Sequence, residues 1–259
     1  MADADAPTER FSGRAQAYAA ARPGYPDALA ASLIGMFGLP ADAVVADLGS
    51  GTGLSCEPFL RAGMTVIGVE PNDAMRAAGD RQLAAFAGFR SVKGTAEATT
   101  LPAASVDLVI AAQAAHWFEP RAAGAEARRI LRPPSHAALI WNDRVSVGDA
   151  FAEGYEALLV EHGGAEYARV RHRHAHHDLV AGFFGHADVR ELRFANPTAL
   201  DYDTLAQRLN SASYVPASDT PAYAPMMAAL RRLFDATARD GRVSMVYETR
   251  VFVGDVRRG

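Results

Sequence analysis

A glycine loop and two carboxylates in the first third of the chain have the spacing of a nucleotide-type binding site. The loop is the run Asp-Leu-Gly-Ser-Gly-Thr-Gly at residues 47–53, and Glu70 follows 21 residues after Gly49. Glycines there allow positive φ and let a ligand touch the backbone, where a side chain would block it. A carboxylate at the end of the next strand can accept both hydroxyls of a ribose. These residues predict a nucleotide-type cofactor site, and a tight turn that binds nothing is the alternative.

Short apolar runs alternate with helical patterns around this loop and must position it. Apolar or β-branched runs predict strands, and apolar residues at three- and four-residue spacing predict helices. The expected strands cover residues 43–48, 64–69, 89–92, 106–110, 137–141, 189–194 and 243–253; the expected helices cover residues 29–37, 54–62, 72–86, 119–131, 200–210 and 225–239, with mostly helical sequence at 147–185. Strands that alternate with helices are typical of βαβ units and of a parallel sheet covered on both faces.

Two cofactor classes fit a glycine loop of this kind. The dinucleotide fingerprint G-x-G-x-x-G/A would need Gly or Ala at Leu54, whereas the third glycine here is Gly53. The position of this glycine, with Asp47 before the loop, resembles motif I of the class I S-adenosylmethionine-dependent methyltransferases. Other segments resemble the small-molecule "type 11" branch of that family: Tyr18 with RPGYP at 22–26, GTAE at 94–97, LP at 101–102, SVDLV at 105–109, AAQAAHWF at 111–118 and WNDR at 141–144. The chain departs from the family pattern at Pro58 and at LRPPS in 131–135.

The resemblance implies an α/β fold with a Rossmann-like, doubly wound, mostly parallel sheet of seven strands, the last one antiparallel. It also implies a helical lid between strands five and six. We expect a single domain over residues 1–259, with a cofactor-binding core at about 11–145, a lid and substrate-side elaboration at about 146–240, and a closing strand at 243–253.

By the same resemblance, the cofactor is S-adenosylmethionine and the product S-adenosylhomocysteine. The implied cofactor contacts are Tyr18, Arg22, Asp47, Gly49, Ser50, Gly51, Gly53, Glu70, Pro71, Asn72, Ala96, Glu97 and Gln113. Arg22 could pair bidentately with the methionine carboxylate, and an arginine on the surface of a helix is the alternative.

The implied reaction is an in-line displacement of the methyl group by an O, N or C atom of a small metabolite. The protein must align the reacting atoms, and a neutral nucleophile also needs a base. His116 is the candidate base, because the loop after the fourth strand lies at the carboxyl edge of the sheet. Alternatively, His116 binds a substrate carboxylate or packs against Trp117; a carboxylate nucleophile needs no base. The expected substrate-binding residues are His116, Trp117, Asn142, Arg144 and Tyr214.

Two other readings of the same features stay open. One is an NAD(P)-dependent oxidoreductase; the other is a non-methylating S-adenosylmethionine-binding protein used for cyclisation or regulation. The histidine-rich run at residues 171–177 invites a metal site, but no carboxylate cluster of ligand spacing accompanies it, so we expect no metal and favour a solvated or substrate-facing segment.

The composition limits the partners. The 259 residues carry 26 Lys and Arg against 30 Asp and Glu, a formal charge of -4, which disfavours a protein that coats DNA or acidic membranes. The single cysteine, Cys56, excludes an internal disulfide framework and a multi-cysteine zinc site. No signal peptide and no membrane-spanning run is visible, so we expect a cytoplasmic protein, monomer or homodimer, with a small-molecule substrate and no bulk nucleic acid.

Overall fold

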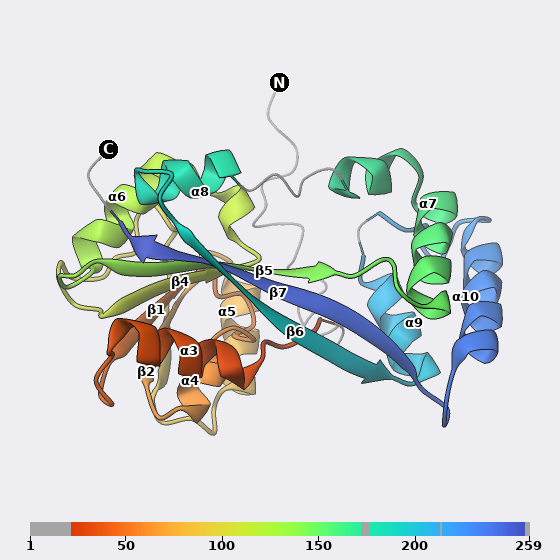
Figure 1. The fold of residues 1–259 in the computed structure, drawn as a ribbon, viewed down its shortest axis with the longest axis horizontal. Coiled ribbons are helices and arrows are strands. Elements are labelled where there is room, and N and C mark those ends of the chain that lie inside the picture. Colours follow the sequence, from red (N-terminus) through yellow and green to blue (C-terminus); the bar gives the residue numbers. More distant parts are fainter. Residues whose placement is uncertain (1–21, 172–176, 213, 257–259) are drawn as a thin grey trace.

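The protein is a seven-stranded sheet covered by helices, seen here in a computed structural model that describes residues 22–171, 177–212 and 214–256 (Figure 1). The strand order is β3-β2-β1-β4-β5-β7-β6. The strands are β1 Val44–Leu48, β2 Thr65–Val69, β3 Phe89–Val92, β4 Leu108–Ala112, β5 His136–Arg144, β6 Arg190–Leu200 and β7 Val243–Asp255. The first five are parallel, and β7 is antiparallel to both β5 and β6. The predicted mostly parallel sheet with an antiparallel last strand is confirmed.

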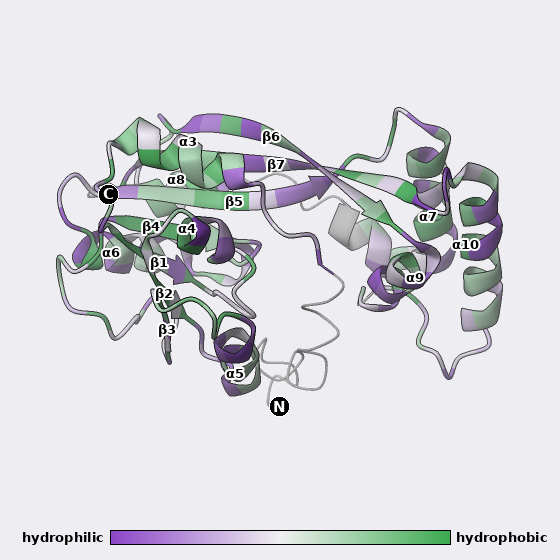
Figure 2. Cartoon of the chain, turned by 90° about the horizontal axis from the view of Figure 1, so that it is seen from below, coloured by the Kyte–Doolittle hydropathy of each residue, from purple (hydrophilic) through white to green (hydrophobic). Residues whose placement is uncertain are grey.

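Alternate residues of the central strands face two separate cores. In β1, Val45 belongs to a cluster with α3 (Asp27–Phe37) and α4 (Glu57–Arg61), while Ala46 belongs to a cluster with α6 (Pro120–Ile130) and α8 (His177–Phe184). Strands buried on both faces have near-continuous apolar sequence, as β4 does over its whole length. Figure 2 shows this apolar character within the sheet and the polar residues on its outer elements.

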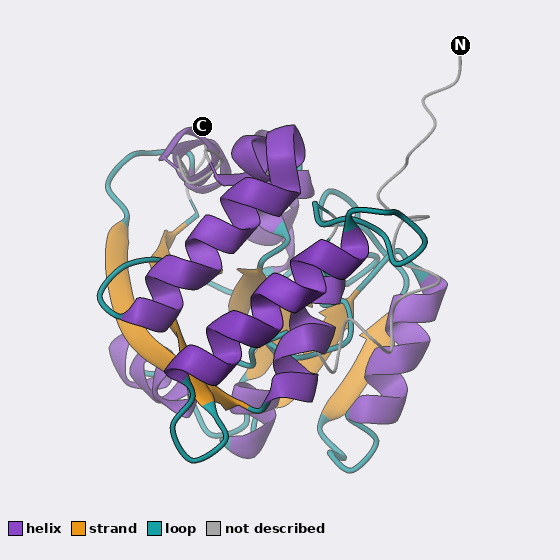
Figure 3. Ribbon diagram, turned by 90° about the vertical axis from the view of Figure 1, so that its right-hand side faces the viewer, coloured by secondary structure: helices purple, strands orange, loops and turns teal. Residues whose placement is uncertain are grey.

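A third core lies at the far ends of β6 and β7. There the strands run past the parallel part of the sheet and pack against α7 (Ala150–Arg171), α9 (Tyr202–Asn210) and α10 (Tyr223–Thr237). Figure 3 looks onto this end, where the helices lie in front of the sheet. We call the third core with these helices the helical lobe. The helices α7 and α8 do follow β5, as expected; a lid action of this segment stays a prediction.

Several predicted elements differ from the structure in length: the helix expected at 72–86 ends at Gln82 and the strand expected at 137–141 spans His136–Arg144, and two further differences have a local cause. The helix expected at 54–62 is only α4, because Gly53 has a φ of +85° and the chain continues in turns up to Cys56. The strand expected at 189–194 runs to Leu200 and includes Pro197. Proline is tolerated there because β6 is the edge strand of the sheet, where a missing N–H donor costs no ladder bond on the open side.

Candidate cofactor and substrate site

A cavity of about 320 Å³ opens at the carboxyl ends of β1 and β4, where the strand order reverses. Ligands of open α/β sheets bind in this crevice, because the loops on its two sides diverge. The lining residues come from the segments that follow β1 to β4, from the strands β4, β5 and β7, and from the segment before α3. They are Arg22, Pro23, Tyr25, Gly49, Ser50, Gly51, Thr52, Leu54, Ser55, Glu70, Pro71, Asn72, Met75, Thr95, Ala96, Glu97, Ala112, Gln113, Ala114, Trp117, Phe118, Asn142 and Tyr247.

The glycine loop forms one wall with its backbone. The N–H groups of Gly49 and Ser50 both donate to the Val69 carbonyl, at 2.8 and 3.2 Å, which ties the loop to the end of β2. Gly49 has a φ of +70°, and a Cβ on it would lie 2.6 Å from the Cβ of Ala114. Only glycine allows this turn and this close approach to the loop after β4.

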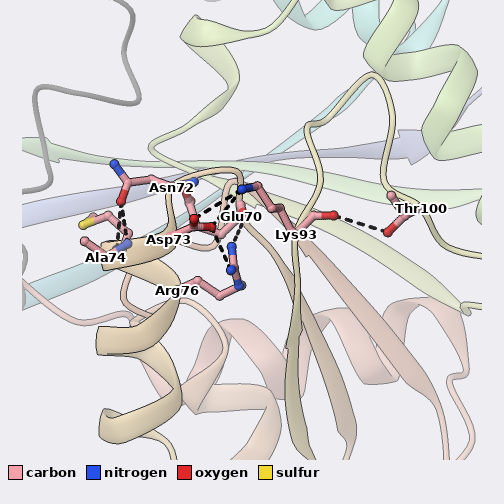
Figure 4. Close-up of polar contacts among 8 residues, drawn as sticks. Glu70, Asn72, Asp73, Ala74, Arg76, Lys93 and Thr100 are labelled. Atoms are coloured by element: carbon pink, nitrogen blue, oxygen red, sulfur yellow. Dashed lines mark hydrogen bonds and ion pairs between the residues drawn. The ribbon is translucent and has the colours of Figure 1, made fainter.

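Glu70 faces the cavity with both carboxylate oxygens engaged by backbone donors. Its Oε2 accepts from the Gly51 N–H at 2.9 Å and its Oε1 from the Asn72 N–H at 2.8 Å. Arg76 donates to its carbonyl at 3.3 Å (Figure 4). Burial raises the pKa of Glu70, and these donors and Arg76 oppose the shift. Each carboxylate oxygen has more than one acceptor site, so capacity remains for two ligand hydroxyls. The arrangement suits a ribose.

Asn72 has a structural role that the resemblance did not assign to it. Its Oδ1 accepts from the N–H groups of Ala74 and Met75, at 2.9 and 3.0 Å, and so caps α5 (Asp73–Gln82). The cap fixes the start of α5 beside Glu70, as the close-up shows (Figure 4). Asn72 therefore lines the cavity and also stabilises the start of the helix that carries Met75.

Asp47 is fully buried beneath the loop and does not line the cavity. Its Oδ2 accepts from Ser55 Oγ at 2.5 Å and from Cys56 Sγ at 3.2 Å, and its Oδ1 has no hydrogen-bond partner among the described residues. Burial raises the pKa of Asp47 to about 7, although the bonds from Ser55 and Cys56 oppose this. Asp47 acts on the cavity through Ser55, which does line it. Such an orphaned acceptor beside the loop fits a ligand with a cationic group.

A chain of amides connects the end of β4 to the segment before α3. Gln113 has a φ of +54°, and its Nε2 donates to the Asn142 carbonyl at 2.9 Å. The side chain of Asn142 donates to the Gly24 carbonyl at 3.2 Å and accepts from Thr249 Oγ1 at 2.5 Å; Asn196 also donates to Gly24, at 2.8 Å. These bonds hold the segment that carries Arg22 and Tyr25 over the cavity.

The remaining wall is aromatic. Trp117 and Phe118 line the cavity, and Trp117 is 45% exposed. His116 lies on the same short helix, η1 (Ala115–Trp117), with its ring 4.9 Å from that of Trp117; it is exposed and is not among the lining residues. Its role as a base stays a prediction.

Arg144 and Tyr214 lie behind the cavity wall, at the helical lobe. Arg144 pairs with Glu156 of α7, which also accepts from the Tyr167 hydroxyl at 2.6 Å, and the guanidinium lies 5.1 Å from the Tyr155 ring centroid. The ring of Tyr214 contacts Tyr167 at 5.0 Å. The structure thus places both residues in one neighbourhood but not on the cavity surface.

The structure brings most of the predicted site together. The predicted residues on the cavity wall are Arg22, Gly49, Ser50, Gly51, Glu70, Pro71, Asn72, Ala96, Glu97, Gln113, Trp117 and Asn142. Asp47, Gly53, His116, Arg144 and Tyr214 are not on it, and Tyr18 lies outside the described residues. Sequence reasoning missed Tyr25 and Tyr247: Tyr25 belongs to the RPGYP segment and could have been found from it, whereas Tyr247 is brought to the cavity only by strand pairing.

Comparisons with known proteins agree with this geometry. The family model described as "Methyltransferase domain" matches residues 46–139, which contain the glycine loop, Glu70 and Gln113. Residues 46–139 form a class I methyltransferase domain. The resemblance to the S-adenosylmethionine-dependent methyltransferases is therefore confirmed for this part of the chain.

Relatives of the methyltransferase domain occur in bacteria and fungi. An uncharacterized methyltransferase of Mycobacterium tuberculosis is 38% identical over 135 residues, 52% of each chain, and an uncharacterized methyltransferase-like protein of Schizosaccharomyces pombe is 32% identical over 128 residues, 49% of each chain. The chain spans about half the length of the curated relatives it matches. A solved structure named as a type II methyltransferase from Anaeromyxobacter dehalogenans has the same fold, with a TM-score of 0.68 over 92% of this chain and 99% of that one, at 23% identity.

Two further observations concern the described residues alone. None of their helices combines the length and apolar character needed to cross a membrane. Within them no group of three or more His, Cys, Asp or Glu side chains is placed to hold a metal ion. Most of the histidine-rich run, residues 172–176, lies outside the described residues.

Proposed function

We propose that this protein transfers a methyl group from S-adenosylmethionine to an O, N or C atom of a small molecule. The observation that carries the proposal is the convergence of the glycine loop, the Glu70 carboxylate and the Asn142-held segment on one cavity at the switch point of the sheet. The family match over residues 46–139 supports it.

The residues of the chain have distinct tasks in this proposal. Glu70 accepts the ribose hydroxyls, and the loop at 49–51 approaches the ligand closely because its glycines carry no side chains. Asp47, which accepts from Ser55 and whose Oδ1 has no partner within the described part of the chain, favours a cationic amino group. Arg22 offers a guanidinium to a carboxylate. When bound, the cofactor supplies an activated methyl group, and the chain contributes alignment of the acceptor and exclusion of water.

The acceptor enters beside Trp117 and Phe118 in this proposal. Trp117 is the exposed aromatic residue on the wall and offers a stacking surface. His116, its neighbour on η1, is exposed and is not among the residues that line the cavity. We therefore expect His116→Ala to retain methyl transfer with an unchanged pH–rate profile if the acceptor is already anionic; lost activity with an altered profile would identify His116 as the base.

A thermal-shift experiment separates this proposal from an oxidoreductase. At about 100 times its dissociation constant, S-adenosylhomocysteine should raise the unfolding midpoint by roughly 5–10 °C, and NAD should not. A response to NAD alone would overturn the proposal. Incubation of metabolite extracts with methyl-deuterated S-adenosylmethionine, read by mass spectrometry, then identifies the acceptor; binding of S-adenosylhomocysteine with no labelled product in any extract favours a non-methylating role.

A further inference from the structure

A partly buried group of arginines, tyrosines and one glutamate lies where the helical lobe meets the cavity. We call it the arginine–tyrosine cluster; its members are Arg144, Tyr155, Glu156, Tyr167, Arg208, Tyr214 and Tyr247. They come from β5, α7, α9, β7 and the segment after α9. Tyr247 alone among them lines the cavity, so it is the point at which the cluster meets a ligand.

The cluster carries more positive than negative charge. Arg144 is paired with Glu156. Arg208 is only 8% exposed; it makes no ion pair with any described carboxylate, and its Nε has no hydrogen-bond partner among the described residues. Within the described part of the chain, the one hydrogen bond of its side chain runs from Nη1 to the Tyr247 hydroxyl, at 3.5 Å. A buried guanidinium without a counter-ion lowers the stability of the protein. One positive charge of the cluster is therefore left for an anionic ligand to neutralise.

Tyr247 connects this charge to the cavity, because the residue lines the cavity and its hydroxyl contacts Arg208. It donates to the sulfur of Met245 at 3.0 Å, although a thioether is a weak acceptor. It accepts from Arg208, which makes its own proton a better donor. An anionic oxygen in the cavity is a stronger acceptor than the sulfur and would capture this proton in a charge-assisted hydrogen bond.

We propose that the methyl acceptor carries a carboxylate, which the Tyr247 hydroxyl receives with Arg208 behind it. The inference rests on the proposed function, because it assigns the acceptor to the part of the cavity beside β7. One uncompensated charge matches a carboxylate, whereas a phosphate monoester carries about 1.5 to 2 negative charges at neutral pH. A neutral acceptor would leave Arg208 uncompensated in the complex.

The test uses small probes on the protein saturated with S-adenosylhomocysteine. Acetate, its neutral analogue acetamide and inorganic phosphate are titrated at constant ionic strength, and the unfolding midpoint is followed. We expect acetate to raise the midpoint and acetamide not to. Tyr247→Phe removes only the hydroxyl and should raise the apparent acetate dissociation constant roughly tenfold or more. Arg208→Gln should do the same.

Arg193→Gln is the matched control, because Arg193 is an exposed arginine of β6 paired with Glu191 and Glu248. It should leave the acetate response within twofold of the wild type. Equal responses to acetate and acetamide, an unchanged response in Tyr247→Phe, or tighter binding of phosphate than of acetate would each overturn the inference. If S-adenosylhomocysteine itself has no effect on the wild type, the proposed function fails instead. Should Arg208→Gln not fold, Tyr247→Phe still decides.

Discussion

At the scale of single residues, the buried carboxyl group of Asp47 makes the stability of the protein depend on pH. Its carboxyl group is fully buried, and burial raises its pKa from 3.8 to about 7. Between those values the folded chain holds a proton that the unfolded chain has lost. The free energy of unfolding therefore falls as the pH rises across that interval, by about 1.4 kcal/mol per unit, and is level above it.

Asp47→Asn should remove this penalty in the ligand-free protein. The free energy of unfolding of the variant, relative to that of the wild type, should increase by roughly 2–3 kcal/mol from pH 5 to pH 8. At this chain length the increase corresponds to about 5–10 °C in the unfolding midpoint. Melting curves of both proteins at the two pH values measure the difference. Asp80→Asn, on the exposed side of α5, controls for the loss of an acidic side chain. A gap between wild type and Asp47→Asn that is the same at both pH values would contradict the prediction.

Glu70 is the second residue whose replacement is informative. Glu70→Ala should weaken S-adenosylhomocysteine binding by roughly tenfold or more, because hydrogen bonds to a charged acceptor contribute about 1.5–3 kcal/mol each. Isothermal titration calorimetry measures the change. Glu161→Ala, at a side chain that is 76% exposed on α7, is the control and should bind normally. Unchanged affinity in Glu70→Ala would remove Glu70 from the ribose site.

At the scale of elements, a close contact between helices α6 and α8 depends on one glycine. A Cβ on Gly124 of α6 would lie 2.1 Å from the backbone carbonyl oxygen of Phe183 in α8. This atom belongs to a helix backbone and cannot rotate away. The two helices together cover one face of the sheet.

Gly124→Ala should therefore lower the free energy of unfolding by about 1–3 kcal/mol, the usual cost of overpacking. Gly35→Ala is the matched variant: Gly35 lies within α3, and nothing would contact its Cβ within 4 Å. It should raise stability by about 0.5–1 kcal/mol, because alanine has the higher helix propensity. Urea denaturation of the two variants gives opposite signs; the same sign in both would show that α6 and α8 can separate without cost.

The elements also show what the sequence could and could not predict. The glycine loop and the Glu70 carboxylate form one wall of the cavity, which we call the cofactor wall. These parts and the strand before the loop lie close together in the sequence, so the run at 47–53 with Glu70 predicted them. The surroundings of Arg144 depend on pairing between distant strands, since Arg144 lies opposite Tyr247 in the register of β5 and β7. The position of Tyr247 on the cavity wall follows from that register, and the ion pair of Arg144 with Glu156 follows from how α7 packs after β5. No pattern of neighbouring residues in the sequence indicates this register.

At the scale of the whole molecule, the three cores suggest a division of tasks. Two of them flank the parallel strands that carry the cofactor wall, and the third holds the helical lobe. β5 ends at Arg144, and the division near residue 145 expected from the sequence stays a prediction. We propose that the lobe shapes the acceptor side while the sheet holds the cofactor.

Leu230→Ala tests this division, because Leu230 of α10 is fully buried in the third core. Truncation should lower stability by about 2–5 kcal/mol and leave the S-adenosylhomocysteine dissociation constant within about twofold. Leu108→Ala, equally buried but in β4, is the control and should weaken both. Chemical denaturation and calorimetry on the same samples give the two quantities. Equal loss of affinity in the two variants would show that the lobe and the cofactor wall are one cooperative unit.

The long pairing of β6 with β7 has a consequence for how such a protein can diversify. After β5 the chain forms α7 and α8, returns to the sheet as β6, leaves it again for α9 and α10, and closes as β7, in which Tyr247 lies opposite Arg144. Because β6 is the edge strand and pairs with β7, the segment between these two residues can be exchanged, β6 included, without interrupting a strand of the parallel part of the sheet that holds the glycine loop. We expect a chimera that grafts a relative's segment between these two residues to keep its affinity for S-adenosylhomocysteine and to acquire the donor's acceptor preference.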